Sequence, residues 1–124
     1  MAVVYVDTNV WIAHFAECEP YSAAFFRDVA SCMHDMVISE LVIDELIRND
    51  AYDKAAFDAF EREGKLRVHA VTDKVRARAR TVPTHFADAI HAASALEANA
   101  VLLTWNVRDF KIPGLRVMKP NDIK

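Results

Sequence analysis

Four acidic residues occupy positions where their side chains could meet although they are far apart in the chain. They are Asp7, Glu45, Asp88 and Asp109. Carboxylate oxygens are the ligands that hard divalent cations such as Mg²⁺ prefer, whereas carboxylates crowded together repel one another and add little stability. The placement of these residues therefore favours a divalent metal site over a purely structural role.

Two of the acids follow segments that are predicted to be strands. Asp7 comes directly after the apolar run 2–6, and Asp109 lies just beyond the run 101–104. In an open parallel sheet, the ligand crevice lies outside the carboxyl ends of the strands, where the strand order reverses. We therefore expect Asp7 and the turn 104–110 to lie at that crevice. An alternative role for Asp7, which needs no active site, is to cap the helix beginning near residue 9.

Glu45 is distinguished by its place on the helix predicted for residues 39–49. Glu40, Asp44 and Arg48 form a row on one side of this helix and are expected to be solvated. Glu45 instead lies at the margin of the apolar face. A carboxylate in that position needs a partner, which can be a metal ion, a basic side chain or water.

Asp88 lies in the first turn of the helix predicted for residues 84–99, which begins after Pro83. The helix dipole favours a negative charge at that end, which is the competing structural explanation for this residue. The many alanines of the helix would let it approach a sheet closely. His85 and His91 flank Asp88 at three residues on either side, but we rank them below the carboxylates, because an oxygen-rich metal site does not require imidazole.

Strand and helix patterns alternate along the chain, which predicts an α/β fold in three layers, α/β/α, around a central parallel sheet of about five strands. The predicted strands are residues 3–6, 36–38, 66–69, 101–104 and 115–118. The predicted helices are residues 9–16, 21–34, 39–49, 53–63, 72–80 and 84–99. No linker, repeat or low-complexity segment divides them, so residues 1–124 are expected to form a single domain.

Composition limits the classes of function. The chain has 124 residues, 53% of them hydrophobic, and a formal net charge of −3, so any contact with nucleic acid must be local. The N-terminus shows no export signal and no segment is long enough to span a bilayer, which favours a cytoplasmic location. Cys18 and Cys32 lack metal-site spacing and are expected to be reduced core residues without chemistry.

Four segments together resemble the PIN-domain family, and specifically its VapC-type toxins. They are Val6-Asp7-Thr8-Asn9, the helix containing Glu45, the segment Phe86-Ala87-Asp88-Ala89-Ile90-His91-Ala92, and the turn Leu103-Thr104-Trp105-Asn106-Val107-Arg108-Asp109-Phe110. No single segment is specific, but their order and separations match over essentially the whole chain.

The resemblance implies a Rossmann-like sandwich, a Mg²⁺- or Mn²⁺-dependent ribonuclease, a homodimer and a small antitoxin protein as partner. Asp7, Glu45 and Asp88 match the metal-binding acids of the family, and Thr8 and Asn9 match residues that line the site. The fourth metal-binding position remains open. Many members have an aspartate where this chain has Asn106, so either Asn106 through its carbonyl oxygen or Asp109 must serve there.

The implied substrate is RNA, single-stranded or structured, whose unpaired bases can stack on aromatic side chains. Residues predicted to contact it, besides those that line the site, are Thr104, Asn106 and Arg108, and Trp105 is a candidate for stacking. The basic run 74–80 could contact phosphates, although solvated helix surface is its default role. An excess of aromatic residues in 11–26 predicts a groove for a partner, with core burial as the default for about half of them.

Two alternatives to a ribonuclease remain at this stage. One is a PIN-like module that has lost most catalysis and binds protein or RNA, which Asn106 keeps open. The other is a metal-dependent phosphatase on a Rossmann-like sheet, which is weakened because no Asp-x-Asp pair follows the first strand.

Overall fold

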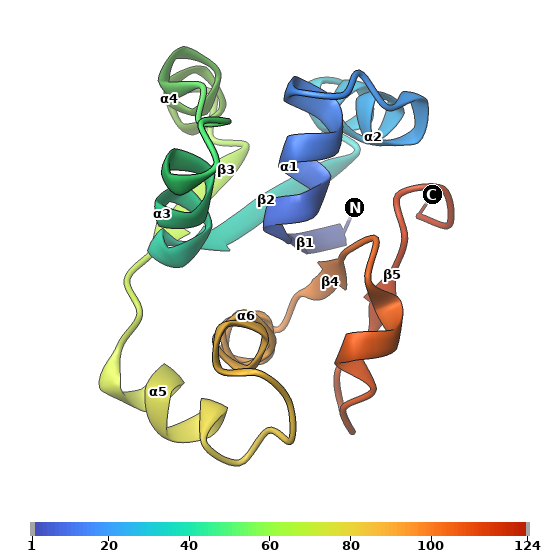
Figure 1. Cartoon of the computed structure of the whole chain (residues 1–124). Helices are drawn as coiled ribbons and strands as arrows, with labels where there is room; N and C mark the ends of the chain where they lie inside the picture. Colours follow the sequence, from blue (N-terminus) through green and yellow to red (C-terminus); the bar gives the residue numbers. More distant parts are fainter. Residues whose placement is uncertain (1, 124) are drawn as a thin grey trace.

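A computed structural model describes residues 2–123 of the chain. Its centre is a five-stranded parallel sheet with the strand order β3-β2-β1-β4-β5 (Figure 1). The strands are β1 (Ala2–Val6), β2 (His34–Ser39), β3 (Leu66–His69), β4 (Val101–Leu103) and β5 (Val117–Met118). The predicted parallel sheet of about five strands is confirmed.

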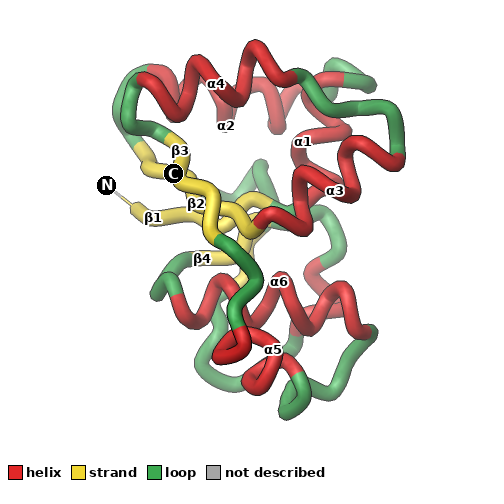
Figure 2. Tube along the Cα trace, turned by 90° about the vertical axis from the view of Figure 1, so that its left-hand side faces the viewer, coloured by secondary structure: helices red, strands yellow, loops and turns green. Residues whose placement is uncertain are grey.

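Helices cover both faces of this sheet, as Figure 2 shows with α1 to α4 on one side and α5 and α6 on the other. The helices are α1 (Thr8–Phe15), α2 (Pro20–Ala30), α3 (Glu40–Arg48), α4 (Lys54–Arg62), α5 (Asp73–Ala79) and α6 (Phe86–Glu97), with a 3₁₀ turn η1 (Val107–Phe110). The predicted three-layer α/β/α architecture is therefore confirmed.

The inner strands are apolar because both of their faces are covered. Val4, Tyr5 and Val6 of β1 are all fully buried, and β4 is buried along its whole length. A strand buried on both faces reads as a continuous apolar run rather than an alternating one. This is why β1 and β4 could be recognised in the sequence.

The strand order reverses next to β1. The chain runs from β1 to β2 and β3 on one side and then crosses to β4 and β5 on the other. The carboxyl ends of β1 and β4 lie together, since Val6 pairs with Leu103 and the amide of Asp7 donates to the carbonyl of Leu103 at 2.9 Å. This is the switch point at which the ligand crevice is expected.

Helix α6 packs directly on the sheet. Its inward residues Ala89, Ala92, Ala93 and Ala95 are buried, and side chains this small let the helix backbone approach the strands closely. The predicted alanine-mediated contact is confirmed, and it brings the first turn of α6 to the end of β1.

One predicted helix was too long. The segment 21–34 was predicted as helix throughout, but α2 ends at Ala30, and His34 begins β2. The amide of Met33 donates to the carbonyl of Asp28 and that of Cys32 to Val29, while Cys32 has φ of 63°. This is a Schellman termination, in which the left-handed position is usually glycine, and because Cys32 occupies it the helix end could not be recognised from the residue type.

The expectation that the cysteines are core residues was wrong. Cys18 and Cys32 are both exposed and unpaired, and both adopt positive φ in turns that flank α2. Between residues 2 and 123, none of the helices is long and apolar enough to cross a membrane.

Candidate active site

Asp7 lies at the reversal point, where its carboxylate is held by the first residue of α1 and by the residue that follows β4. Its Oδ1 accepts from the amide of Thr8 at 2.8 Å, and its Oδ2 accepts from the Thr104 hydroxyl at 2.8 Å. The residue is the N-cap of α1 and is only 6% exposed. The capping role that the sequence left open is therefore confirmed, and the site role remains a prediction.

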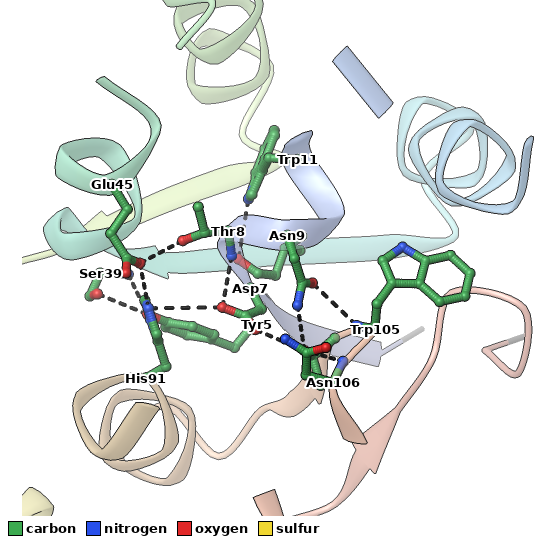
Figure 3. Close-up of polar contacts among 12 residues, drawn as sticks. Tyr5, Asp7, Thr8, Asn9, Trp11, Ser39, Glu45, His91, Trp105 and Asn106 are labelled. Carbon is green, nitrogen blue, oxygen red and sulfur yellow. Dashed lines mark hydrogen bonds and ion pairs between the residues drawn. The ribbon is translucent and has the colours of Figure 1, made fainter. Parts of the chain in front are cut away.

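Glu45 reaches the same place from α3. Its Oε1 accepts from the Thr8 hydroxyl at 2.7 Å and lies 2.6 Å from Nε2 of His91, as Figure 3 shows. The side chain is 22% exposed, so the predicted position at the margin of the apolar face is confirmed. Its partners inside the protein are a hydroxyl and an imidazole.

His91, which we ranked below the carboxylates as a metal ligand, belongs to the same polar cluster. It is 1% exposed, and its Nε2 faces both Glu45 and, at 3.8 Å, Oδ1 of Asp7. On the other side of the ring, Nδ1 lies 2.7 Å from the Tyr5 hydroxyl, which also contacts Ser39 Oγ at 2.8 Å. The sequence feature that could have identified His91 is its place on the apolar face of the helix that carries Asp88. His85, in contrast, is exposed at the start of α6 and joins no such network.

Asp88 lies in the first turn of α6, half-buried, one turn before His91. Its pKa is raised, first by burial and next by the negative charge of Asp7; Asp109 and Glu45 act in the same direction, and His91 opposes them. The charge of Asp88 is therefore coupled to the other acids across the crevice.

The opposite wall of the site follows β4. Thr104 is fully buried, and its hydroxyl accepts from the side-chain amide of Asn9 and from the backbone amide of Asn106, each at 3.1 Å. Asn9 in turn accepts from the backbone amide of Trp105 at 3.2 Å. The predicted site residues Thr8, Asn9 and Thr104 thus form the hydrogen-bonded frame around Asp7.

Asn106, Arg108 and Asp109 lie farther out on this turn, and all three are exposed. Asp109 belongs to η1, whose position is tied to the loop before α6 because Thr84 Oγ1 donates to the Asp109 carbonyl at 3.3 Å. A cavity of about 530 Å³ beside the turn is lined by Trp105, Asn106, Val107, Arg108, Asp109 and Lys119.

The ionisation of the two inner acids differs. Burial raises the pKa of Asp7, and its hydrogen bonds and His91 only partly offset this effect. Burial also disfavours the Glu45 carboxylate, but the hydrogen bonds from His91 and Thr8 outweigh it and hold the pKa of Glu45 below its usual range. The site concentrates negative charge, and among the residues that shift these two pKa values only His91 and Arg48 can offset it with positive charge.

The donor chemistry fits a hard divalent cation. The only ligand atoms of Asp7, Glu45 and Asp88 are carboxylate oxygens. The negative charge of Glu45 makes Asp7 harder to ionise, and the charges of both make Asp88 harder to ionise. As the side chains lie, no three Asp, Glu, His or Cys residues within 2–123 converge closely enough to form a ready-made metal cage. The residues that would hold an ion are these three acids, with Asn106 or Asp109 at the rim.

Several residues that were considered for substrate or partner contacts are engaged elsewhere. Lys74 and Arg78 both pair with Glu97 of α6, at 3.3 and 2.6 Å. Phe110, at the end of the same turn, is buried in the core, and the Trp105 indole donates to Ser22 Oγ at 3.1 Å. Of the aromatic group in 11–26, Trp11, Phe25 and Phe26 are buried and only Tyr21 is largely exposed, at 57%, so core burial accounts for most of the group.

Comparison with known proteins identifies the family. The sequence profile of the PIN domain matches residues 4–113, and the chain therefore belongs to the PIN domain family. Comparison with curated protein sequences gives no significant match.

Similar folds occur in three solved toxin–antitoxin structures. A chain of the DNA-bound VapBC2 complex of Rickettsia felis is 20% identical with a TM-score of 0.72, over 94% of this chain and 98% of that one. A chain of the DNA-bound VapBC of Salmonella typhimurium is 21% identical with a TM-score of 0.69, over 97% of this chain and 99% of that one. A chain of VapBC-1 of nontypeable Haemophilus influenzae is 21% identical with a TM-score of 0.64, over 95% of this chain and 98% of that one. At these identities the likeness establishes the fold.

Proposed function

We propose that this protein is a Mg²⁺- or Mn²⁺-dependent ribonuclease and the toxin of a toxin–antitoxin pair. The observation that carries the proposal is the meeting of Asp7 and Glu45, from β1 and α3, at the switch point of the sheet, with Asp88 coupled to them by charge. Membership of the PIN domain family and the fold shared with VapBC chains support it.

In this proposal the three acids hold the cation, which when bound supplies a Lewis acid that lowers the pKa of a water molecule and draws charge from the phosphodiester. Thr8 and Thr104 keep Asp7 and Glu45 in place, since each donates its hydroxyl to one of these carboxylates. The burial of Asp7 excludes bulk water from that part of the site. No protein nucleophile is needed.

The turn after β4 supports RNA as the substrate. Arg108 and Lys119 are exposed cations in the wall of the cavity beside Asn106 and Asp109. Local cations of this kind can contact phosphates even though the whole chain is acidic. We propose that this cavity receives the strand next to the scissile phosphate.

A small antitoxin protein and a second copy of the chain are the partners we propose. The structures with a similar fold are VapBC complexes and a toxin–antitoxin complex from Klebsiella pneumoniae. Phe86 and Ile47 leave 71% and 57% of their surface exposed, and apolar side chains this exposed are available to a partner. We also propose that the protein is cytoplasmic, because RNA and such a partner would be present there.

The test is cleavage of a labelled single-stranded RNA by the purified chain in Mg²⁺ or Mn²⁺, repeated with EDTA. We expect cleavage that stops on chelation and is absent from Glu45→Gln. Asp44→Asn is the matched control, because Asp44 is an exposed acid on the same helix, and it should cleave like the parent. Cleavage that survives chelation would overturn the metal mechanism, and RNA binding without cleavage would favour the alternative of a binding module.

A further inference from the structure

His91 makes a pair of contacts that the proposed chemistry does not account for. It is a buried imidazole on α6 whose Nε2 lies 2.6 Å from Glu45 Oε1, while its Nδ1 lies 2.7 Å from the Tyr5 hydroxyl. A buried histidine is less costly when both ring nitrogens have hydrogen-bond partners, and for a purely structural role any two polar groups would serve. Here one of the two is a carboxylate of the candidate site.

Glu45 needs external positioning. A glutamate side chain has several rotatable bonds, and fixing one rotamer costs up to about 2 kcal/mol of conformational entropy. Thr8 and His91 both donate to the same oxygen, Oε1, from α1 and α6. Two donors from different elements fix the direction of the carboxylate and leave Oε2 available.

The contact with Glu45 fixes which nitrogen of His91 donates. The Glu45 carboxylate can only accept, so Nε2 must donate. In the neutral ring Nδ1 then accepts from the Tyr5 hydroxyl, whose oxygen accepts in turn from the amide of Ser39 at 3.3 Å and from its hydroxyl at 2.8 Å. Both ring nitrogens of His91 and the Tyr5 hydroxyl thus have partners, and the tautomer of the neutral ring follows from the network.

We propose that His91 is a positioning residue, held in its orientation by Tyr5 and Ser39, that holds Glu45 so that Oε2 is presented to the divalent cation. The inference rests on the proposed function. Groups that hydrogen-bond to metal ligands orient them, and their loss commonly lowers metal affinity by about 10- to 100-fold. One helix, α6, therefore contributes an acid, Asp88, and the residue that orients a second acid on α3.

The first experiment measures Mn²⁺ affinity by titration calorimetry, which does not depend on RNA cleavage. His91→Leu should bind Mn²⁺ about 10- to 100-fold more weakly. His91→Gln should recover part of this loss, because its amide can donate to Glu45. His34→Leu is the matched control, since it removes a buried histidine whose ring nitrogens have no hydrogen-bond partner within residues 2–123, and it should bind like the parent.

A second readout is the tautomer itself, measured by nitrogen NMR of histidine-labelled protein without metal. At a pH where the ring is neutral, the parent should carry its proton on Nε2 of His91, and Tyr5→Phe, which removes the partner of Nδ1, should weaken Mn²⁺ binding. Tyr5→Phe and His91→Gln keep the test decisive if His91→Leu does not fold.

The outcomes separate the two claims. Folded His91 and Tyr5 variants that bind Mn²⁺ as tightly as the parent would overturn the positioning role alone. A parent chain that neither binds Mn²⁺ nor cleaves RNA would overturn the proposed function, and the inference with it.

Discussion

Glu45 and His91 are 46 residues apart in the chain, yet Nε2 of the histidine lies 2.6 Å from Oε1 of the glutamate. The contact joins α3 to α6, and Asp7 at the end of β1 lies beside it, 3.8 Å from the same nitrogen. Helices α3 and α6, which cover opposite faces of the sheet, therefore meet the end of β1 at one polar cluster. The contacts with His91 bring Asp7 and Glu45 together, and the sequence alone does not reveal these contacts.

Asp88→Asn should abolish RNA cleavage without unfolding the domain. Asp88 is half-buried and has a raised pKa, so its charge is not a net source of stability. We expect cleavage at background level and a free energy of unfolding within about 1 kcal/mol of the parent. RNA cleavage and urea unfolding of the same preparation measure both, and loss of soluble protein would instead indicate a structural role.

The fourth metal-binding position can be assigned by comparing two variants. If Asp109 supplies the charge, Asp109→Asn should weaken Mn²⁺ binding more than Asn106→Ala does, because a carboxylate attracts a dication more strongly than an amide oxygen. Calorimetric titration gives the ranking. The reverse order would assign the position to Asn106, and two unchanged affinities would leave a site of three acids.

Thr104→Val should destabilise the fold by about 1–3 kcal/mol, because it leaves buried polar groups without their partner. The Thr104 hydroxyl is fully buried and bonds to Asp7, Asn9 and the amide of Asn106. Thr81→Val is the control, since Thr81 is exposed and its hydroxyl donates only to the local carbonyl of Arg78. Equal urea midpoints for the two variants would show that the frame around Asp7 adds no stability.

His34 should make the fold less stable in mild acid. It stacks on Phe25 without a hydrogen-bond partner within the described residues, and burial lowers its pKa, although the charge of Asp28 opposes this. The unfolded chain therefore takes up a proton on this ring more readily than the folded one, and stability falls as the pH drops below the ordinary pKa of about 6.5.

The check is urea unfolding of the parent and His34→Leu at roughly pH 8 and pH 5.5. The parent should lose more stability on acidification than the variant, by at most about 1.4 kcal/mol per pH unit. Parallel losses in the two proteins would mean that His34 does not titrate differently in the folded and unfolded states.

The sheet could be predicted from the sequence because β1 and β4 are apolar on both faces, and the acids could be predicted because strand ends and helix starts locate Asp7 and Asp88. Helix ends were harder. The α2 terminus depends on Cys32 in the left-handed conformation, and Asp50 and Asn99 adopt positive φ just after α3 and α6. Glycine would have marked the position of Cys32, but cysteine does not, whereas aspartate and asparagine are enriched among the non-glycine residues that adopt this conformation.

The role of His91 could not be predicted for a different reason. Its partners Tyr5 and Glu45 come from β1 and α3, and a single sequence does not show which distant residues meet. The same holds for Lys74 and Arg78, whose pairing with Glu97 depends on the packing of α5 on α6. Local patterns predicted where polar groups lie, and only the fold shows what they contact.

Asp7, Glu45 and Asp88 are proposed to form a site for a divalent cation. The melting temperatures of the parent and of Asp7→Asn, measured with and without Mg²⁺ or Mn²⁺ at fixed ionic strength, test this proposal. Without metal, Asp7→Asn should melt higher, because it removes a buried charge beside other carboxylates. Metal should stabilise the parent by roughly 2.7 kcal/mol at a hundredfold excess over the dissociation constant, and the variant much less. If Asp7→Asn instead melts lower without metal and responds to metal as the parent does, Asp7 is a helix cap and the metal site lacks its central ligand.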